Sequence, residues 1–152
     1  MKNDLKFAIQ ELERFIEKHS DINTDISSST VGWQIDHTLK VITSITFALK
    51  NSDPSAFKSN FNFKRSMVFW RGSIPRGIAK APKSVQSDGT IAIDDLKTAI
   101  KNAFISLDIL NDLHPKSNFK HPYFGILNLK QSIKFIEIHS VHHLKIIQDI
   151  LK

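Results

Sequence analysis

Residues 128–150 carry the strongest structural signal in the chain and read NLKQSIKFIEIHSVHHLKIIQDI. Asn128, followed three residues later by Gln131, matches a capping box, the pattern that begins an α-helix. Apolar and histidine side chains then recur every three or four residues, so they share one face of the predicted helix. The residues on that face are Ile133, Ile136, His139, His143, Ile146 and Ile150. Such a face is typically buried against other helices.

Three earlier segments have the same helical periodicity. The four predicted helices span residues 3–19, 32–50, 94–114 and 128–150. Asn3 or Asp4 is the candidate cap of the first and Asp94 that of the third, which ends before Pro115 because a residue preceding proline avoids the helical region. Strand-like alternation extends no further than residues 91–93. We therefore predict an all-α fold, a four-helix bundle that forms a single domain over residues 1–152.

A long connection, here called the crossover segment (residues 54–93), separates the second and third predicted helices. Its length lets the chain travel along the bundle, so these two helices are predicted to be parallel. Proline and glycine make most of the segment irregular, with one short helix predicted around residues 57–69. It also holds a cluster of aromatic residues, Trp70 and four phenylalanines, and the phenylalanines are spaced as if to pin it onto the bundle: Phe57, Phe61, Phe63 and Phe69.

The formal net charge of +6 is concentrated in the crossover segment. Residues 54–87 hold seven of the 21 basic residues and none of the 15 acidic ones, whereas the rest of the chain is nearly neutral. Basic residues interleaved with aromatic ones can contact phosphates and stack on bases, so nucleic-acid binding through residues 54–87 is one hypothesis. The predicted packing of the phenylalanines onto the bundle argues against it, and we do not expect a nucleic-acid partner.

The chain contains no cysteine. This excludes a disulfide scaffold, thiolate zinc sites, iron–sulfur clusters and a cysteine nucleophile, so any thiol chemistry needs an external thiol. The N-terminal residues lack the uninterrupted apolar region of a secretory signal, and no stretch approaches the roughly 18 apolar residues that cross a bilayer. We expect a cytoplasmic protein with no membrane partner.

Three histidines lie on predicted inward faces. His139 and His143 are one helical turn apart, with Cβ atoms about 6 Å from each other, and His37 lies on an apolar face of the second helix. Three neutral imidazoles on one divalent ion leave open positions for water or substrate and can lower the pKa of bound water. The alternative is that these are ordinary core histidines satisfied by hydrogen bonds.

Other residues near the predicted site have more than one interpretation. His142 is a rival of His143 as the ligand, a hydrogen-bonding neighbour or a solvent-facing residue, and His121 lines the mouth of the site or serves only a turn. Trp33 walls the pocket or simply packs in the core. Three cations of the crossover segment either draw an anionic substrate to the site or are solvated: Arg71, Arg76 and Lys80.

Trp33-x-x-x-His37 in the second predicted helix and His139-x-x-His142-His143 in the last resemble the DinB-like superfamily of bacterial metal-binding four-helix bundles. The stretch from His121 to Gly125, HPYFG, is similar to one branch of that superfamily that is catalogued as a domain of unknown function. Arg71-Gly72 and the APKS stretch at residues 81–84 contribute to the same similarity. The resemblance spans nearly the whole chain, and the order and spacing of its short motifs carry it.

The resemblance implies an up-down-down-up bundle, a homodimer, and a divalent metal held by His37, His139 and His143. Characterised relatives include transferases that use low-molecular-weight thiols such as bacillithiol and a mycothiol-dependent isomerase, and other relatives are known as stress- or damage-induced proteins. The sequence contains no thiol-cofactor motif that we can identify.

We therefore expect a metal-dependent enzyme that acts on a small-molecule substrate, by hydrolase chemistry or by thiol-dependent transfer. Histidine ligands suit zinc, nickel, iron or copper, and the sequence does not choose among them. The alternative is a non-catalytic dimeric or stress-related module whose histidines hold a structural ion or none. A fourth protein ligand that closes the coordination shell would favour this alternative.

Overall fold

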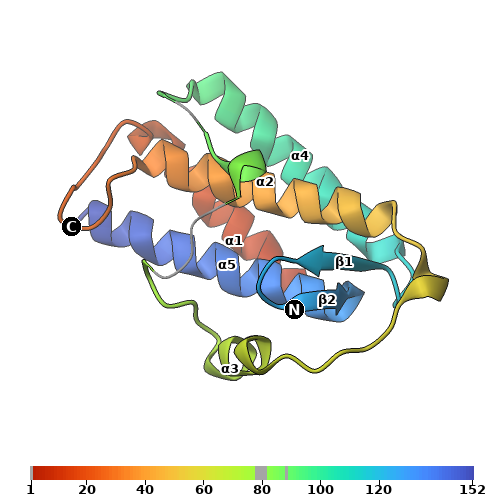
Figure 1. Cartoon of the computed structure of the whole chain (residues 1–152). Helices are drawn as coiled ribbons and strands as arrows, with labels where there is room; N and C mark the ends of the chain where they lie inside the picture. Colours follow the sequence, from red (N-terminus) through yellow and green to blue (C-terminus); the bar gives the residue numbers. More distant parts are fainter. Residues whose placement is uncertain (1, 78–81, 88) are drawn as a thin grey trace.

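The computed structural model describes residues 2–77, 82–87 and 89–152, and the chain is predominantly helical (Figure 1). Four long helices lie within these residues: α1 (Lys2–Arg14), α2 (Val31–Lys50), α4 (Ile93–Asp112) and α5 (Leu129–Ile150). The shorter elements are α3 (Phe63–Arg71), strands β1 (Asn118–His121) and β2 (Gly125–Asn128), and 3₁₀ turns at Ile16–Lys18, Pro54–Ala56 and Lys83–Val85. None of the helices in the described residues combines the length and apolar character that a membrane span requires.

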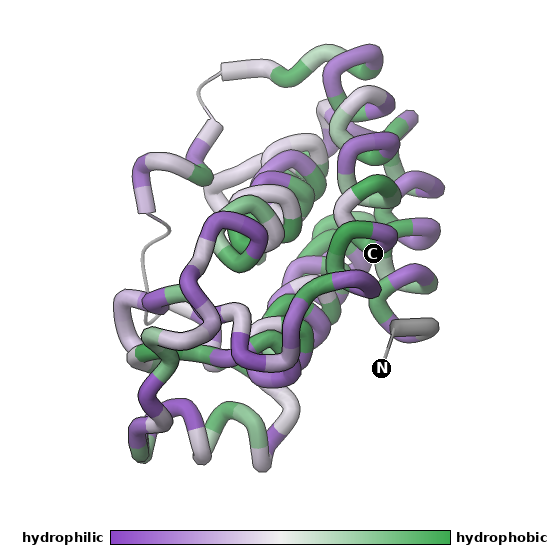
Figure 2. The backbone as a smooth tube through the Cα atoms, turned by 90° about the vertical axis from the view of Figure 1, so that its right-hand side faces the viewer, coloured by the Kyte–Doolittle hydropathy of each residue, from purple (hydrophilic) through white to green (hydrophobic). Residues whose placement is uncertain are grey.

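The four long helices enclose the hydrophobic core. Both α1 and α2 pack against α4 and against α5, and α2 and α4 run in one direction while α1 and α5 run in the other (Figure 1). Figure 2 shows hydrophobic residues on the sides of the helices that face their neighbours and hydrophilic residues toward the outside. The largest fully buried side chains are Leu5, Ile9, Leu12, Val31, Ile35, Leu39, Ile42, Leu49, Leu96, Leu127, Ile136 and Ile147.

The two helices that carry the histidines begin at side-chain caps. The Thr30 hydroxyl oxygen accepts a hydrogen bond from the Trp33 backbone N–H (3.1 Å), which satisfies one of the free donors in the first turn of α2. At the start of α5, the Gln131 N–H donates to Asn128 Oδ1 (2.9 Å) and the Asn128 N–H donates to Gln131 Oε1 (3.1 Å). The capping box predicted from the sequence is confirmed.

The predicted caps of the other two helices are wrong. Asn3 and Asp4 lie inside α1, which begins at Lys2. The N-cap of α4 is Ala92, whose side chain makes no capping hydrogen bond, and Asp94 lies in the first turn. An acidic residue there is stabilised by the positive end of the helix dipole, so Asp94 favours the same helix start without capping it.

A small antiparallel sheet precedes α5, in a region that the sequence indicated as a turn. β1 pairs with β2 from Asn118 opposite Asn128 to His121 opposite Gly125. Each strand has only four residues, too few for an alternating pattern to be recognised in the sequence. Gly125 has φ of +71°, a left-handed conformation that suits glycine at the end of the turn. The fold is therefore mostly helical with one added hairpin.

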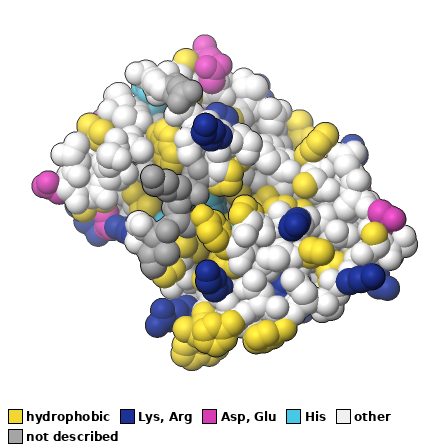
Figure 3. Space-filling model, viewed as in Figure 1, with side chains coloured by type: hydrophobic (Ala, Val, Ile, Leu, Met, Phe, Trp, Pro, Cys, Tyr) yellow, Lys and Arg dark blue, Asp and Glu magenta, His cyan; other side chains and the backbone are white. Residues whose placement is uncertain are grey.

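The aromatic residues of the crossover segment do not all pin it to the core. Phe69 packs against the core, but Phe61, Phe63 and Trp70 are 82%, 69% and 83% exposed. Figure 3 shows hydrophobic side chains together with Lys and Arg side chains along the edge of the molecule where α3 lies. The prediction that the phenylalanines attach the segment to the helices is wrong for two of the four, Phe61 and Phe63.

A buried arginine attaches the crossover segment instead. Arg65, in α3, is 7% exposed. Its Nη1 donates to the backbone oxygens of Phe124 (3.2 Å) and Ile126 (3.3 Å) in the hairpin and to Asn60 Oδ1 (3.1 Å), and its Nη2 donates to the Asn60 backbone oxygen. We call this arrangement the Arg65 clamp. It joins the crossover segment to the hairpin through oxygen atoms that carry no formal charge.

We expect Arg65→Ala to lower the free energy of unfolding by about 2–3 kcal/mol, because it removes several hydrogen bonds to a charged donor and leaves buried carbonyl oxygens unpaired. Lys64→Ala is the control, since Lys64 is the exposed neighbour on the same helix. Urea denaturation followed by circular dichroism measures both variants. Equal stabilities of the two variants would contradict the assigned role of the clamp.

Candidate metal centre

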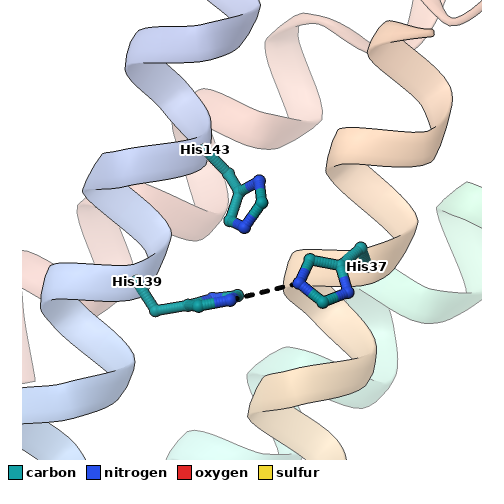
Figure 4. Close-up of side chains that lie close together, drawn as sticks. All are labelled: His37, His139 and His143. Atoms are coloured by element: carbon teal, nitrogen blue, oxygen red, sulfur yellow. Dashed lines mark hydrogen bonds between the residues drawn. The ribbon is translucent and has the colours of Figure 1, made fainter. Parts of the chain in front are cut away.

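Three histidines from two helices meet in the interior (Figure 4). His37 lies on α2, and His139 and His143 lie one turn apart on α5. One ring nitrogen of each lies within 4.8 Å of the others, close enough to bind a single metal ion. The side chains are 4%, 8% and 7% exposed, respectively. The predicted set of three is therefore assembled by the packing of α2 on α5.

Two of the imidazoles have their Nδ1 atoms held by oxygen acceptors. His37 Nδ1 lies 2.9 Å from the Val85 carbonyl oxygen, which can only accept, so Nδ1 carries the proton and Nε2 keeps its lone pair. His143 Nδ1 donates to Gln34 Oε1 (2.6 Å) in the same way. The Gln34 amide is oriented by donating its own N–H to Ser27 Oγ (3.2 Å). Oxygen partners of this kind select the tautomer that metal-binding histidines use.

The third imidazole faces the first. His139 Nε2 lies 3.1 Å from His37 Nε2, the contact drawn in Figure 4. The buried His139 Nδ1 has no hydrogen-bond partner among the described residues. A buried nitrogen without a partner destabilises the fold. Such destabilising polar groups are expected at functional sites, where the residues are arranged to bind a ligand and not to stabilise the fold.

All three imidazoles are biased toward the neutral form. Burial lowers the pKa of His37 below its usual value, although the hydrogen bond to Val85 opposes the shift. Burial, followed by the proximity of the other imidazoles, holds the pKa values of His139 and His143 well below the usual range. Neutral imidazole is the form that binds a metal ion, so at neutral pH no proton has to be displaced. The donor set therefore fits a divalent transition-metal ion.

A cavity of about 460 Å³ adjoins the three histidines. Its lining comes from α2, α5, the hairpin and six residues of the crossover segment: Ile74, Pro75, Gly77, Pro82, Ser84 and Val85. The aromatic lining residues are Trp33, Phe119, His121, Tyr123, Phe124, Phe135 and the three clustered histidines, and His142 also contributes. No Asp, Glu, Lys or Arg is among the described residues that line it.

Trp33 and His121 both line this cavity. Trp33 stacks on His37, with ring centroids 4.9 Å apart and planes at 11°, so it forms a wall beside the ligand cluster. His121 Nδ1 accepts hydrogen bonds from the backbone N–H groups of Tyr123 (3.1 Å) and Phe124 (3.2 Å). Both interpretations of His121 from the sequence therefore apply, because it closes the hairpin turn and borders the cavity.

The two N–H donors also determine where His121 carries its proton. Because Nδ1 accepts, the neutral ring carries its proton on Nε2. The ring stacks on Phe124 at 4.4 Å between centroids. Burial lowers the pKa of His121 to about 4, so the ring is neutral at physiological pH. His121 therefore offers an uncharged N–H donor.

The structure places His142 beside the cluster and not within it. The group of possible ligands contains His143, and the His142 ring meets the His143 ring edge-on at 5.0 Å. Burial lowers the pKa of His142, with a smaller contribution from Arg76. Of the two rival histidines, His143 is the one whose nitrogen reaches His37 and His139.

Two of the three cations proposed to attract an anion, Arg71 and Arg76, are not brought to the cavity. Arg76 is exposed and pairs with Asp149, with Nη2 2.7 Å from Oδ2. Arg71 is exposed at the end of α3, and neither arginine lines the cavity. Lys80 lies outside the described residues.

Two residues that support the site were missed in the sequence. Gln34 precedes His37 by three residues and so lies on the same face of α2, a spacing that could have identified it. Val85 lies 48 positions from His37 in the chain, and no local pattern indicates that its carbonyl oxygen contacts the imidazole.

No protein-family model, curated protein or solved structure matches the chain.

We expect Gln34→Leu to weaken divalent-metal binding about 10- to 100-fold, because it removes the acceptor that orients His143. Gln34→Glu is the matched control: it keeps an oxygen acceptor at the same place and should retain the affinity. Competition with a chromophoric chelator measures both values on protein whose fold is verified by circular dichroism. Equal affinities for the Leu and Glu variants would show that this hydrogen bond does not support metal binding.

Proposed function

We propose that the protein is a divalent-metal-dependent enzyme of the DinB-like type, acting on a small molecule by hydrolysis or by transfer to an external low-molecular-weight thiol. The proposal includes a DinB-like arrangement of the four long helices and a homodimer, both of which rest on the resemblance in sequence. The observation that carries the enzymatic function is the convergence of His37, His139 and His143 beside a cavity.

The composition of the site favours chemistry over a purely structural ion. Among the described residues, the group of possible ligands has three members and no fourth carboxylate or imidazole. A structural zinc site is normally closed by four protein ligands, whereas a catalytic site uses three and leaves a position open. The adjoining cavity gives a substrate access to that position.

The residues at the site would have separate roles in the proposed function. His37, His139 and His143 would hold zinc, nickel or iron, which supplies Lewis acidity and lowers the pKa of a bound water or thiol. Val85 and Gln34 fix two of the imidazoles in the required tautomer. Trp33 and the hairpin aromatics line the cavity and would limit the access of water, and the neutral His121 would be an N–H donor for a bound molecule.

Elemental analysis of protein purified without a histidine tag tests the proposed metal site. We expect about one divalent ion per chain in the native protein, and loss of it in His37→Ala and His143→Ala, because two imidazoles hold an ion far less tightly than three. His142→Ala is the control and should keep the ion. Equal metal content in all four folded proteins would contradict the proposed ligand set.

The cobalt-loaded protein distinguishes the enzyme from a structural module. Azide should change the visible absorption spectrum of bound cobalt if a coordination position is open, and leave it unchanged if protein ligands close the shell. An unchanged spectrum would favour the non-catalytic module.

A second candidate function is nucleic-acid binding through residues 54–87, which the exposure of three aromatic residues favours. Phe61, Phe63 and Trp70 are available to stack on bases. Lys64 and Arg71 are exposed on α3, the helix that also carries Phe63 and Trp70. If this function is correct, the affinity for a single-stranded polynucleotide should fall steeply between low and physiological salt. It should also fall in Trp70→Ala but not in Phe47→Ala, an exposed aromatic residue on α2. A flat salt dependence would reject this function.

A further inference from the structure

The charge of the site indicates what the cavity binds. The three candidate ligands are neutral imidazoles, and the atoms that support them are the uncharged oxygens of Val85 and Gln34. Many metal-bound histidines are supported by carboxylates, which offset part of the metal charge. Here a divalent ion would keep its full charge of about +2, in surroundings where charges interact more strongly than in water.

The acidic residues on the two ligand-bearing helices offset little of this charge, because the effect of Asp36 on the pKa of His37 is opposed by Lys40, and Asp149 pairs with Arg76 and Lys152. Asp36 precedes His37, but its carboxylate pairs with Lys40 (2.7 Å) and accepts a hydrogen bond from Ser87. Glu137 precedes His139 by two residues, and neither Asp36 nor Glu137 lines the cavity. Because no charged side chain is among the described lining residues, a negatively charged group on the bound molecule would compensate this charge when it takes the place of a bound water or hydroxide.

The walls of the cavity indicate the chemical character of the rest of the bound molecule. Phe124 and Phe135 meet edge-to-face at 5.7 Å, and the His121 ring stacks on one and meets the other edge-on. Phe119 adds a further aromatic surface. Apolar area removed from water contributes about 25 cal/mol per Å², and aromatic pairs in these geometries add to it. A cavity of about 460 Å³ is within the range that encloses small organic ligands.

We infer that the cavity binds a small organic monoanion with an aromatic body, its carboxylate or thiolate at the three histidines and its ring among Phe119, Phe124 and Phe135. The His121 N–H is then available to a polar substituent of the same molecule. This inference rests on the proposed function, because the metal ion supplies the positive charge that selects the anion.

A matched set of four probes tests it on the zinc-loaded full chain. 3-Phenylpropanoate has both the anionic group and the ring. 3-Phenylpropan-1-ol and 3-phenylpropylamine have the ring without an anionic group, and propanoate has the anionic group without the ring. In a Trp70→Phe background, Trp33 is the one remaining tryptophan and lines the cavity, so its fluorescence reports binding. We expect the Kd of 3-phenylpropanoate to be lower than the Kd of each of the other three probes by about tenfold or more.

Variants separate the two parts of the inference. Phe119→Ser should weaken the binding of 3-phenylpropanoate and leave the affinity for propanoate unchanged. Phe47→Ser, outside the cavity, should change neither affinity. His143→Ala, which removes the metal, should abolish the preference for the anion over the alcohol. If the native protein takes up zinc but binds the alcohol or the amine as tightly as the anion, this inference alone is overturned. If it takes up no divalent ion, the proposed function fails and the inference fails with it.

Discussion

The buried contact between α2 and α5 places three imidazoles away from water. Much of the surrounding structure follows from the need to provide hydrogen-bond partners for their ring nitrogens. A buried imidazole destabilises the fold unless it is hydrogen-bonded or bound to a metal. His37 and His143 each use one carbonyl oxygen, from Val85 and from the side chain of Gln34. The 3₁₀ turn at Lys83–Val85 must therefore lie against α2, and the Gln34 side chain must extend toward α5. Part of the crossover segment is positioned by the requirements of one histidine.

The helices and the three histidines could be predicted from the sequence because both depend on local spacing. Positions three or four apart share a face of a helix whatever the tertiary structure, so His139 and His143 had to be neighbours. The same reasoning placed His37 on an inward face, and the choice between His142 and His143 needed the rotation of α5 in the folded chain. Gln34 was within reach of the same spacing argument, whereas Val85 was not, since its contact with His37 depends on the path of the crossover segment.

The crossover segment shows where hydrophobicity alone misleads. Its phenylalanines suggested attachment by apolar burial, yet Phe61 and Phe63 are exposed and a basic residue, Arg65, is buried. The guanidinium of Arg65 can be buried because backbone and amide oxygens of Asn60, Phe124 and Ile126 receive its protons. Such a set of acceptors exists only once the hairpin has formed, and strands of four residues give too weak a pattern to be recognised beforehand.

The ligand cluster and the aromatic wall of the cavity come from separate parts of the chain. The ligand cluster belongs to α2 and α5, which are held by the helical core, whereas Phe119, His121 and Phe124 belong to the hairpin, which the Arg65 clamp fastens to the crossover segment. Substitutions in the hairpin can thus reshape the wall without moving the histidine nitrogens. In evolutionary terms, the lining of the cavity is free to diverge while the three histidines are inherited unchanged, so under the proposed function selectivity could change without a change in reactivity.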